Sequence, residues 1–329
     1  MSNNRRADAP ESVSGAEQIR DPLSRSRQSR KDTIKRLIIF LVISFVPFIV
    51  IVPILCAYFG EPIYASTDPD ISVVTYCLGV FGMMIPSCAN LITRLVTGEG
   101  FKNSYLGANF KGKMGYWIAS VAVKLAESVI CLLLMWALFA DGMSFSDTFP
   151  GIDTQNTGLL MIQLAFTVVI FFPAFGEEWG WRGYMMPKLF ELMPKPAAVI
   201  VGGVIWGLWH APLTIAGHNF GVDYLGYPFV GIGLMCLMCV LMNTFLTLLT
   251  EKTRSIYPAT FCHAVNNNLQ PTILLSIFGS EAALDKIASV DVIPGAAVSL
   301  SVSAAVFAVS FVLLIRTDTK SRKSFDKAA

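Results

Sequence analysis

The sequence predicts an all-α polytopic membrane protein, a bundle of about eight transmembrane helices with both termini in the cytosol. Three observations favour this fold class. Hydrophobic residues make up 54% of the 329 residues and charged residues only 15%, proportions outside the range of soluble domains. Eight apolar stretches approach the roughly 20 residues that a helix needs to cross a bilayer. The segments that connect these stretches alternate in charge.

The apolar stretches are expected to be helices, because the hydrocarbon core holds no water to satisfy the backbone of an irregular segment. Residues 37–315 are predicted to form one membrane domain. The polar, basic residues 1–36 lack apolar periodicity and are predicted to be a disordered cytosolic tail, and residues 316–329 a basic cytosolic tail. The expected spans are 37–59, 73–96, 115–140, 157–175, 197–217, 228–249, 256–278 and 292–315.

The charge of the connecting segments predicts the topology. Segments after the first, third, fifth and seventh spans are acidic and nearly free of Lys and Arg, whereas the alternate segments carry residues such as Lys102, Lys188 and Lys252. By the positive-inside rule the basic segments face the cytosol, so the protein is expected in the cell membrane with the lipid bilayer as its partner. A net charge of +2 without a basic face, and without a phosphate-binding glycine loop, favours neither nucleic acid nor nucleotide as a partner.

The stretch FGEEWGWRG carries Glu177, Glu178 and Arg182 beside a long apolar run, where charge is costly. On one helix Glu178 and Arg182 are i,i+4 neighbours and can pair. Glu177 lies about 100° around the helix without that partner, which suits a general acid or base. The alternative is that these residues are ordinary charges at a cytosolic helix end.

Two further groups contain polar side chains within apolar stretches. His210 ends WGLWH and could hold a proton, although a lone buried histidine is more often a hydrogen-bonded core residue. His263 and Asn267 in FCHAVNNN are i,i+4 neighbours, so both donors could polarise a carbonyl or, alternatively, bind neighbouring helices. His218, in an apparent outer loop, is interpreted as a surface residue.

The order EExxxR, aromatic-xxx-H and HxxxN, each on its own predicted helix within residues 157–278, resembles the CAAX protease and bacteriocin-processing (CPBP, or Abi) family of intramembrane endopeptidases. The resemblance implies that residues 157–278 are the catalytic core and that a Glu-activated water hydrolyses a membrane-associated protein or peptide. It implies that Glu177 activates the water with His210 and that His263 and Asn267 hold the oxyanion. Glu178 and Arg182 would then fix the geometry of the site. The matching residues are Glu177, Glu178, Arg182, Trp206, His210, His263 and Asn267, with Trp206 standing where phenylalanine is common.

The resemblance leaves metal dependence open. Glu177, His210 and His263 could supply the three protein ligands of a catalytic zinc site, yet the close-spaced HExxH pattern of many zinc proteases is absent. Two other functions also stay open: a non-catalytic immunity or partner-binding protein on the same fold, and a transporter that relays protons. Within the resemblance, the substrate could be a prenylated CAAX protein, a peptide precursor or another membrane protein.

One condition must hold for the three groups to meet. Glu177 lies near the end of its predicted span, whereas His210 lies about 20 Å along another helix. We therefore expect a continuous or kinked helix over about residues 158–190, with the glutamates buried and reached by water from the cytosolic side. Lys124 and Glu127, three residues apart in the third span, are predicted to neutralise one another inside the bundle.

Overall fold

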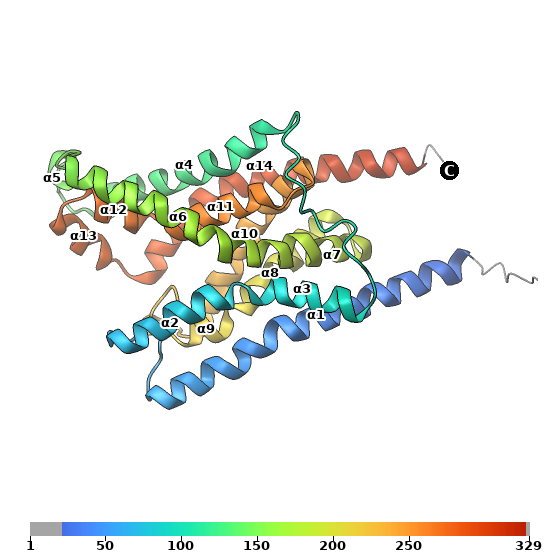
Figure 1. Ribbon diagram of the computed structural model, residues 1–329. Coiled ribbons are helices and arrows are strands. Elements are labelled where there is room, and N and C mark those ends of the chain that lie inside the picture. The colour runs from blue at the N-terminus through green and yellow to red at the C-terminus, as the bar shows by residue number, and fades with distance from the viewer. Residues whose placement is uncertain (1–21, 327–329) are drawn as a thin grey trace, which may run out of the picture.

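The computed structural model describes residues 22–326. Throughout this range the elements are helices, with no strand among them, which confirms the all-α fold class (Figure 1). In order they are α1 (Pro22–Phe59), α2 (Pro69–Gly82), α3 (Ile85–Val96), α4 (Met114–Phe139), α5 (Phe145–Thr148), α6 (Thr154–Gly180), the π-helical turn η1 (Trp181–Met185), α7 (Met186–Leu192), α8 (Lys195–Trp209), α9 (Ala211–Ile215), α10 (Phe229–Thr253), α11 (Tyr257–Asn268), α12 (Pro271–Phe278), α13 (Glu281–Ala288) and α14 (Val292–Asp326).

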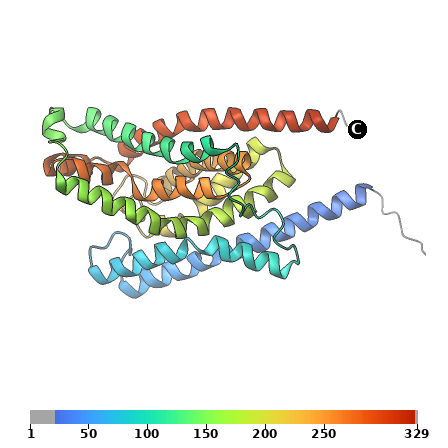
Figure 2. The ribbon, with the colours of Figure 1, turned by 45° about the horizontal axis from the view of Figure 1, so that its top comes forward.

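The helices form layers around α6. On one side α1, α2 and α3 lie together, and α3 packs against both α1 and α6 (Figure 2). On the other side lie α4 and α14, and between the two layers α11 packs on α6 and α4 while α10 packs on α8 and α14. Helices α6, α8 and α11, which carry the three motifs, are therefore at the centre of the bundle.

Six helical segments in the described range are long and apolar enough to cross a membrane, so the chain is a multi-pass integral membrane protein. They match six of the eight predicted spans, with α2 and α3 forming one segment and α6, η1 and α7 another. The predicted count of eight stays a prediction, because the other two spans correspond to shorter helices. The six segments are Gln28–Phe59, Pro69–Val96, Met114–Phe139, Thr154–Leu192, Phe229–Thr253 and Val292–Arg316.

The predicted spans 197–217 and 256–278 are each divided into two helices. Helix α11 ends at Asn268, and Gln270 is extended with φ −66° and ψ 158°. Pro271 explains this break, because a proline disfavours helical geometry in the residue before it. Helix α8 ends at Trp209 and the chain continues into the short helix α9. Apolar residues on both sides of each break give one continuous apolar stretch, which hides the break from the sequence pattern.

The outer ends of the membrane domain also differ from the prediction. Helix α1 begins at Pro22, so residues 22–36 are helical and not an irregular tail, and α14 continues through the predicted tail to Asp326. The rest of both predicted tails, 1–21 and 327–329, lies outside the described residues. The beginning of α1 and the end of α14 lie at the same end of the bundle (Figures 1 and 2). This placement agrees with termini on one side of the membrane, and the cytosolic assignment of that side stays a prediction.

Both glutamates lie within one helical run of 39 residues, Thr154–Leu192, which confirms the expected helix over about 158–190. The run begins with a capping box between Asp153 and Asn156. Glu177 lies about 22 Å along the helix from Leu192 at 1.5 Å per residue. Glu177 is only 2% exposed, so it is buried within the bundle and does not lie at a helix end.

Two glycines allow the motif helices to approach their neighbours closely. A Cβ atom on Gly180 would lie 2.3 Å from Cβ of Pro86 in α3. A Cβ atom on Gly207 would lie 2.4 Å from Cα of Cys236 in α10. Since neither position has room for a side chain, glycine at each sets how closely α6 approaches α3 and α8 approaches α10.

The ion pair predicted within the third span is present in α4. Lys124 Nζ lies 2.7 Å from Glu127 Oε2, and both side chains are largely buried. The predicted neutralisation of the two charges inside the bundle is confirmed.

Candidate active site

Glu178 is held by two charged or polar neighbours from different helices. Its Oε1 atom accepts a hydrogen bond of 2.9 Å from Arg182, and both side chains are 0% exposed. The same oxygen lies 2.7 Å from Nδ1 of His263 on α11. The i,i+4 pair predicted from the sequence is therefore confirmed, and Glu178 also joins α6 to α11, which spacing within one helix could not reveal.

Glu177 faces a different set of donors. Its Oε2 atom accepts hydrogen bonds from two indole N–H groups, at 3.1 Å from Trp181 Nε1 and at 2.6 Å from Trp206 Nε1. Its other oxygen, Oε1, accepts no hydrogen bond from any side chain in the described part of the chain. The two adjacent glutamates therefore have separate surroundings, with charged partners at Glu178 and neutral donors at Glu177.

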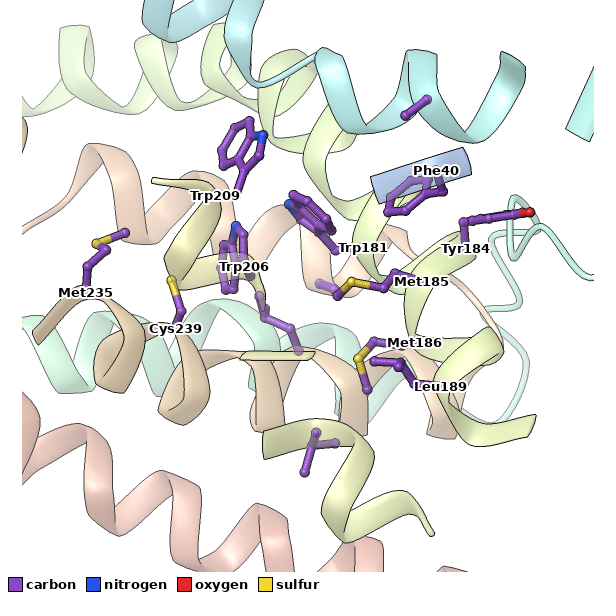
Figure 3. Packing of buried hydrophobic residues seen from close by; sticks show 14 of the residues in the cluster. Phe40, Trp181, Tyr184, Met185, Met186, Leu189, Trp206, Trp209, Met235 and Cys239 are labelled. Carbon is purple, nitrogen blue, oxygen red and sulfur yellow. The ribbon is translucent and has the colours of Figure 1, made fainter. Parts of the chain in front are cut away.

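Trp206 contacts four members of this cluster, namely Glu177, Arg182, His210 and His263. The face of its ring lies 4.1 Å from Cζ of Arg182, which is a cation–π contact. Its ring meets that of His263 edge-on, with centroids 5.5 Å apart. Figure 3 shows Trp206 beside Trp181 and Trp209, and all three residues are buried. The sequence pattern marks Trp206 only as the aromatic position of its motif. It does not indicate these contacts, because an indole in an apolar helix is usually a core residue.

His210 lies at the junction of α8 and α9. Its Nδ1 atom is 2.9 Å from the backbone oxygen of Trp206. Because a carbonyl oxygen can only accept, this contact assigns the proton of a neutral ring to Nδ1 and leaves Nε2 as an acceptor. No direct hydrogen bond joins His210 to Glu177 within the described residues, and Trp206 connects the two.

His218, predicted to be a surface residue, is half-buried beside the cluster. Its ring is nearly parallel to that of His210, with centroids 6.5 Å apart and an interplanar angle of 4°, and it meets Tyr64 edge-on. Gly217, with φ of +96°, turns the chain after α9 and returns His218 toward α8. Gly217 was the one sequence signal of this turn. A glycine at that position does not indicate which residue His218 will contact.

Asn267 lies on the flank of α11, away from the hydrogen-bonded cluster. It is exposed, and its Nδ2 atom is 4.0 Å from Sδ of Met83. The buried asparagine of this helix is Asn268, which binds Gln163 and Thr167 of α6. The structure thus brings five of the six predicted site residues together around Trp206 and leaves Asn267 beside them.

Residues 159–269 match the family described as type II CAAX prenyl endopeptidase Rce1-like. Over these residues the chain is therefore similar to CAAX proteases. A curated protein named CAAX prenyl protease 2, from Methanococcus maripaludis, is 29% identical over 140 residues, which are 42% of this chain. The match spans about half, 46%, of the length of that relative. The resemblance based on the three motifs is confirmed, and all six predicted site residues lie inside the family segment.

The zinc site predicted at Glu177, His210 and His263 stays a prediction. Glu177 could present Oε1 to a metal ion, and His210 and His263 could each present Nε2. The Nδ1 atom of each histidine contacts an oxygen, of Trp206 and of Glu178 respectively, as the second nitrogen of a metal-binding histidine usually does. Within the described residues, however, no three His, Cys, Asp or Glu side chains converge closely enough to hold a metal ion.

A second polar cluster surrounds Glu99, in the loop between α3 and α4, and binds residues of η1 and α7. Glu99 accepts hydrogen bonds from Lys188 and, at 3.0 Å, from Tyr184, and lies 3.7 Å from Arg36. Burial raises the pKa of Glu99, but the Lys188 charge and hydrogen bond, with Tyr184 and Arg36, outweigh it and lower the pKa below its ordinary value. This cluster joins α1, the loop, η1 and α7.

Proposed function

We propose that this protein is an intramembrane endopeptidase that hydrolyses a peptide bond in a membrane-associated protein or peptide. The observation that carries the proposal is the free Oε1 of Glu177, buried at the meeting point of three motif helices. Peptide hydrolysis needs a base, a positioned water and donors for the oxyanion. Each need has a candidate in the cluster around Trp206.

In the proposed first step, Oε1 of Glu177 takes a proton from water while the water oxygen attacks the carbonyl carbon of the substrate. His210 accepts a hydrogen bond at Nε2 from the second O–H of the same water, which keeps that hydrogen, because Nδ1 of His210 donates to the carbonyl of Trp206. The carbonyl π bond opens and its electron pair becomes the oxyanion.

His263 and Asn267 are the proposed donors to the oxyanion. Since Nδ1 of His263 already donates to Glu178, its Nε2 is a donor when the ring carries both protons. Asn267, exposed on the flank of α11, would donate from the side on which substrate arrives.

In the second proposed step the tetrahedral intermediate collapses, the C–N bond breaks, and Glu177 returns its proton to the leaving amine nitrogen. Glu178 and Arg182 act by fixing His263 and do not contact the substrate. The cytosolic side, where the basic segments lie, is the proposed side of entry.

The test compares cleavage by the purified protein in lipid vesicles with that of Glu177→Gln and His210→Ala. Two substrates are used, a CAAX peptide with a farnesylated cysteine and the same peptide without the lipid. We expect both variants to lose at least a hundredfold in turnover, as removal of an acid–base group does. The double variant Lys124→Met/Glu127→Gln, which neutralises another buried glutamate together with its charged partner, should retain cleavage.

The outcomes separate the alternatives. Retained cleavage in both site variants would overturn the mechanism. If instead the wild type cleaves neither peptide, and the variants still support the function of the protein in cells, the non-catalytic alternative replaces the proposal. Cleavage of the farnesylated peptide alone would identify a prenylated substrate class.

A further inference from the structure

We propose that Trp206 and Trp181 are positioning residues that fix which oxygen of Glu177 acts as the base. This inference rests on the proposed function and adds to it a requirement for indole at these two positions. It concerns the neutral hydrogen-bond donors of the site, which the motif pattern did not assign.

The direction of the hydrogen bonds carries the argument. An indole N–H can only donate, so Oε2 of Glu177 must accept in both contacts, at 2.6 Å from Trp206 and 3.1 Å from Trp181. Two donors on one oxygen leave no room there for a proton. A proton taken up during turnover must therefore bind Oε1, the atom without a protein donor.

The helical positions of the two indoles make the arrangement rigid. Trp181 is the first residue of η1 and reaches back four residues to Glu177 on the same helical run. Trp206 comes from α8, and its ring is only 3% exposed. Because the donors come from two different elements, rotation of the Glu177 side chain would break both contacts. The carboxylate is thereby held with Oε1 as the oxygen that accepts from neither indole.

Trp206 has two separable properties. Its face lies on Arg182 and its N–H donates to Glu177. Phenylalanine keeps a ring face for the guanidinium group and lacks the N–H, so Trp206→Phe removes the contact to Glu177 alone. Trp181→Phe does the same for the second donor.

Trp209 provides a matched control. It is 1% exposed, packs edge-on against Trp181 and donates its indole N–H at 2.9 Å to the backbone oxygen of Ser44. Trp209→Phe therefore removes a buried indole N–H of the same kind that does not bind Glu177. A role limited to filling space would give similar results for all three phenylalanine variants.

The experiment measures kcat and KM of peptide cleavage from about pH 5 to pH 9 for the wild type and the three variants in lipid vesicles. A hydrogen bond to an ionised group favours the ionised form, so its loss should move the acid limb of the kcat profile upward. We expect a shift of about one pH unit and roughly a tenfold loss of kcat for Trp206→Phe, with KM changed less than about twofold. Trp181→Phe should shift the limb in the same direction by less, and Trp209→Phe should leave it in place.

Two results are decisive. A folded Trp206→Phe protein with the wild-type acid limb and kcat, when Glu177→Gln is inactive, overturns this inference and leaves the proposed function intact. Activity in Glu177→Gln overturns the proposed function itself. If Trp206→Phe does not fold, Trp181→Phe decides the question, since an unchanged acid limb in that variant also overturns the inference.

Discussion

Replacing Arg182 with methionine should destabilise the protein by leaving a buried carboxylate without its charged partner. In the wild type, Oε1 of Glu178 accepts from Arg182 at 2.9 Å, and both side chains are 0% exposed. Removing one partner of a buried ion pair costs about 3–5 kcal/mol, because the remaining charge stays out of water. His263 would be the one remaining donor to Glu178 among the described residues.

The double variant Arg182→Met/Glu178→Gln removes both charges. A neutral pair of similar volume is often as stable as the ion pair it replaces, so we expect the double variant to lie within roughly 1–2 kcal/mol of the wild type. Unfolding by SDS titration in mixed micelles, followed by circular dichroism, measures the difference. Cleavage should stay at least about tenfold reduced in the double variant, because a glutamine at 178 holds His263 less firmly than a carboxylate does.

One result would refute this reasoning about charge. If the double variant is as unstable as Arg182→Met alone, the lost stability comes from the packing of Arg182 on Trp206, where the guanidinium carbon lies 4.1 Å from the ring. If cleavage returns together with stability, Glu178 does not position His263.

Three further outcomes follow from other parts of the structure. Because the folded-state pKa of Glu99 is lowered, its contribution to stability is present above the ordinary value of 4.5 and is lost as pH falls through the lower folded value. Thermal melts between about pH 6 and pH 3 should therefore show Glu99→Gln less stable than the wild type at pH 6 and converging with it in acid, and a constant gap would contradict this. Gly207→Ala should destabilise the protein by about 2 kcal/mol or more in the same melts, since the added Cβ would lie 2.4 Å from Cα of Cys236. Gly233→Ala is the control and should not destabilise the protein, because no atom lies within 4 Å of its added Cβ. Because the proposed mechanism uses no metal, dialysis against a zinc chelator should leave turnover unchanged, and a loss of turnover that added zinc restores would contradict that mechanism.

Features that depend on spacing within one helix could be predicted from the sequence. The pairs Glu178–Arg182 and Lys124–Glu127 follow from helical geometry, and both are present. The buried position of Glu177 followed from a geometric requirement, since the three motifs could meet only if its helix continued. Each of these predictions needed only the pitch of a helix and the cost of burying charge.

Features that depend on how helices pack could not be predicted in this way. The contact of His263 with Glu178 is set by the packing of α11 on α6, and that of Trp206 with Glu177 by the approach of α8. An indole between apolar neighbours has the same sequence pattern whether its N–H meets a carboxylate or, as in Trp209, a backbone carbonyl. The break before Pro271 was hidden because apolar residues lie on both sides of it.

The different proposed roles of the two glutamates follow from the charge of their donors. Along the same helical run, Trp181 reaches back four residues to Glu177 and Arg182 reaches back four residues to Glu178. A guanidinium donor binds a carboxylate more strongly than a neutral donor does. Two parallel i,i+4 contacts thus give Glu178 a charged partner and Glu177 a neutral one, which is the difference on which their proposed roles as positioning group and general base rest.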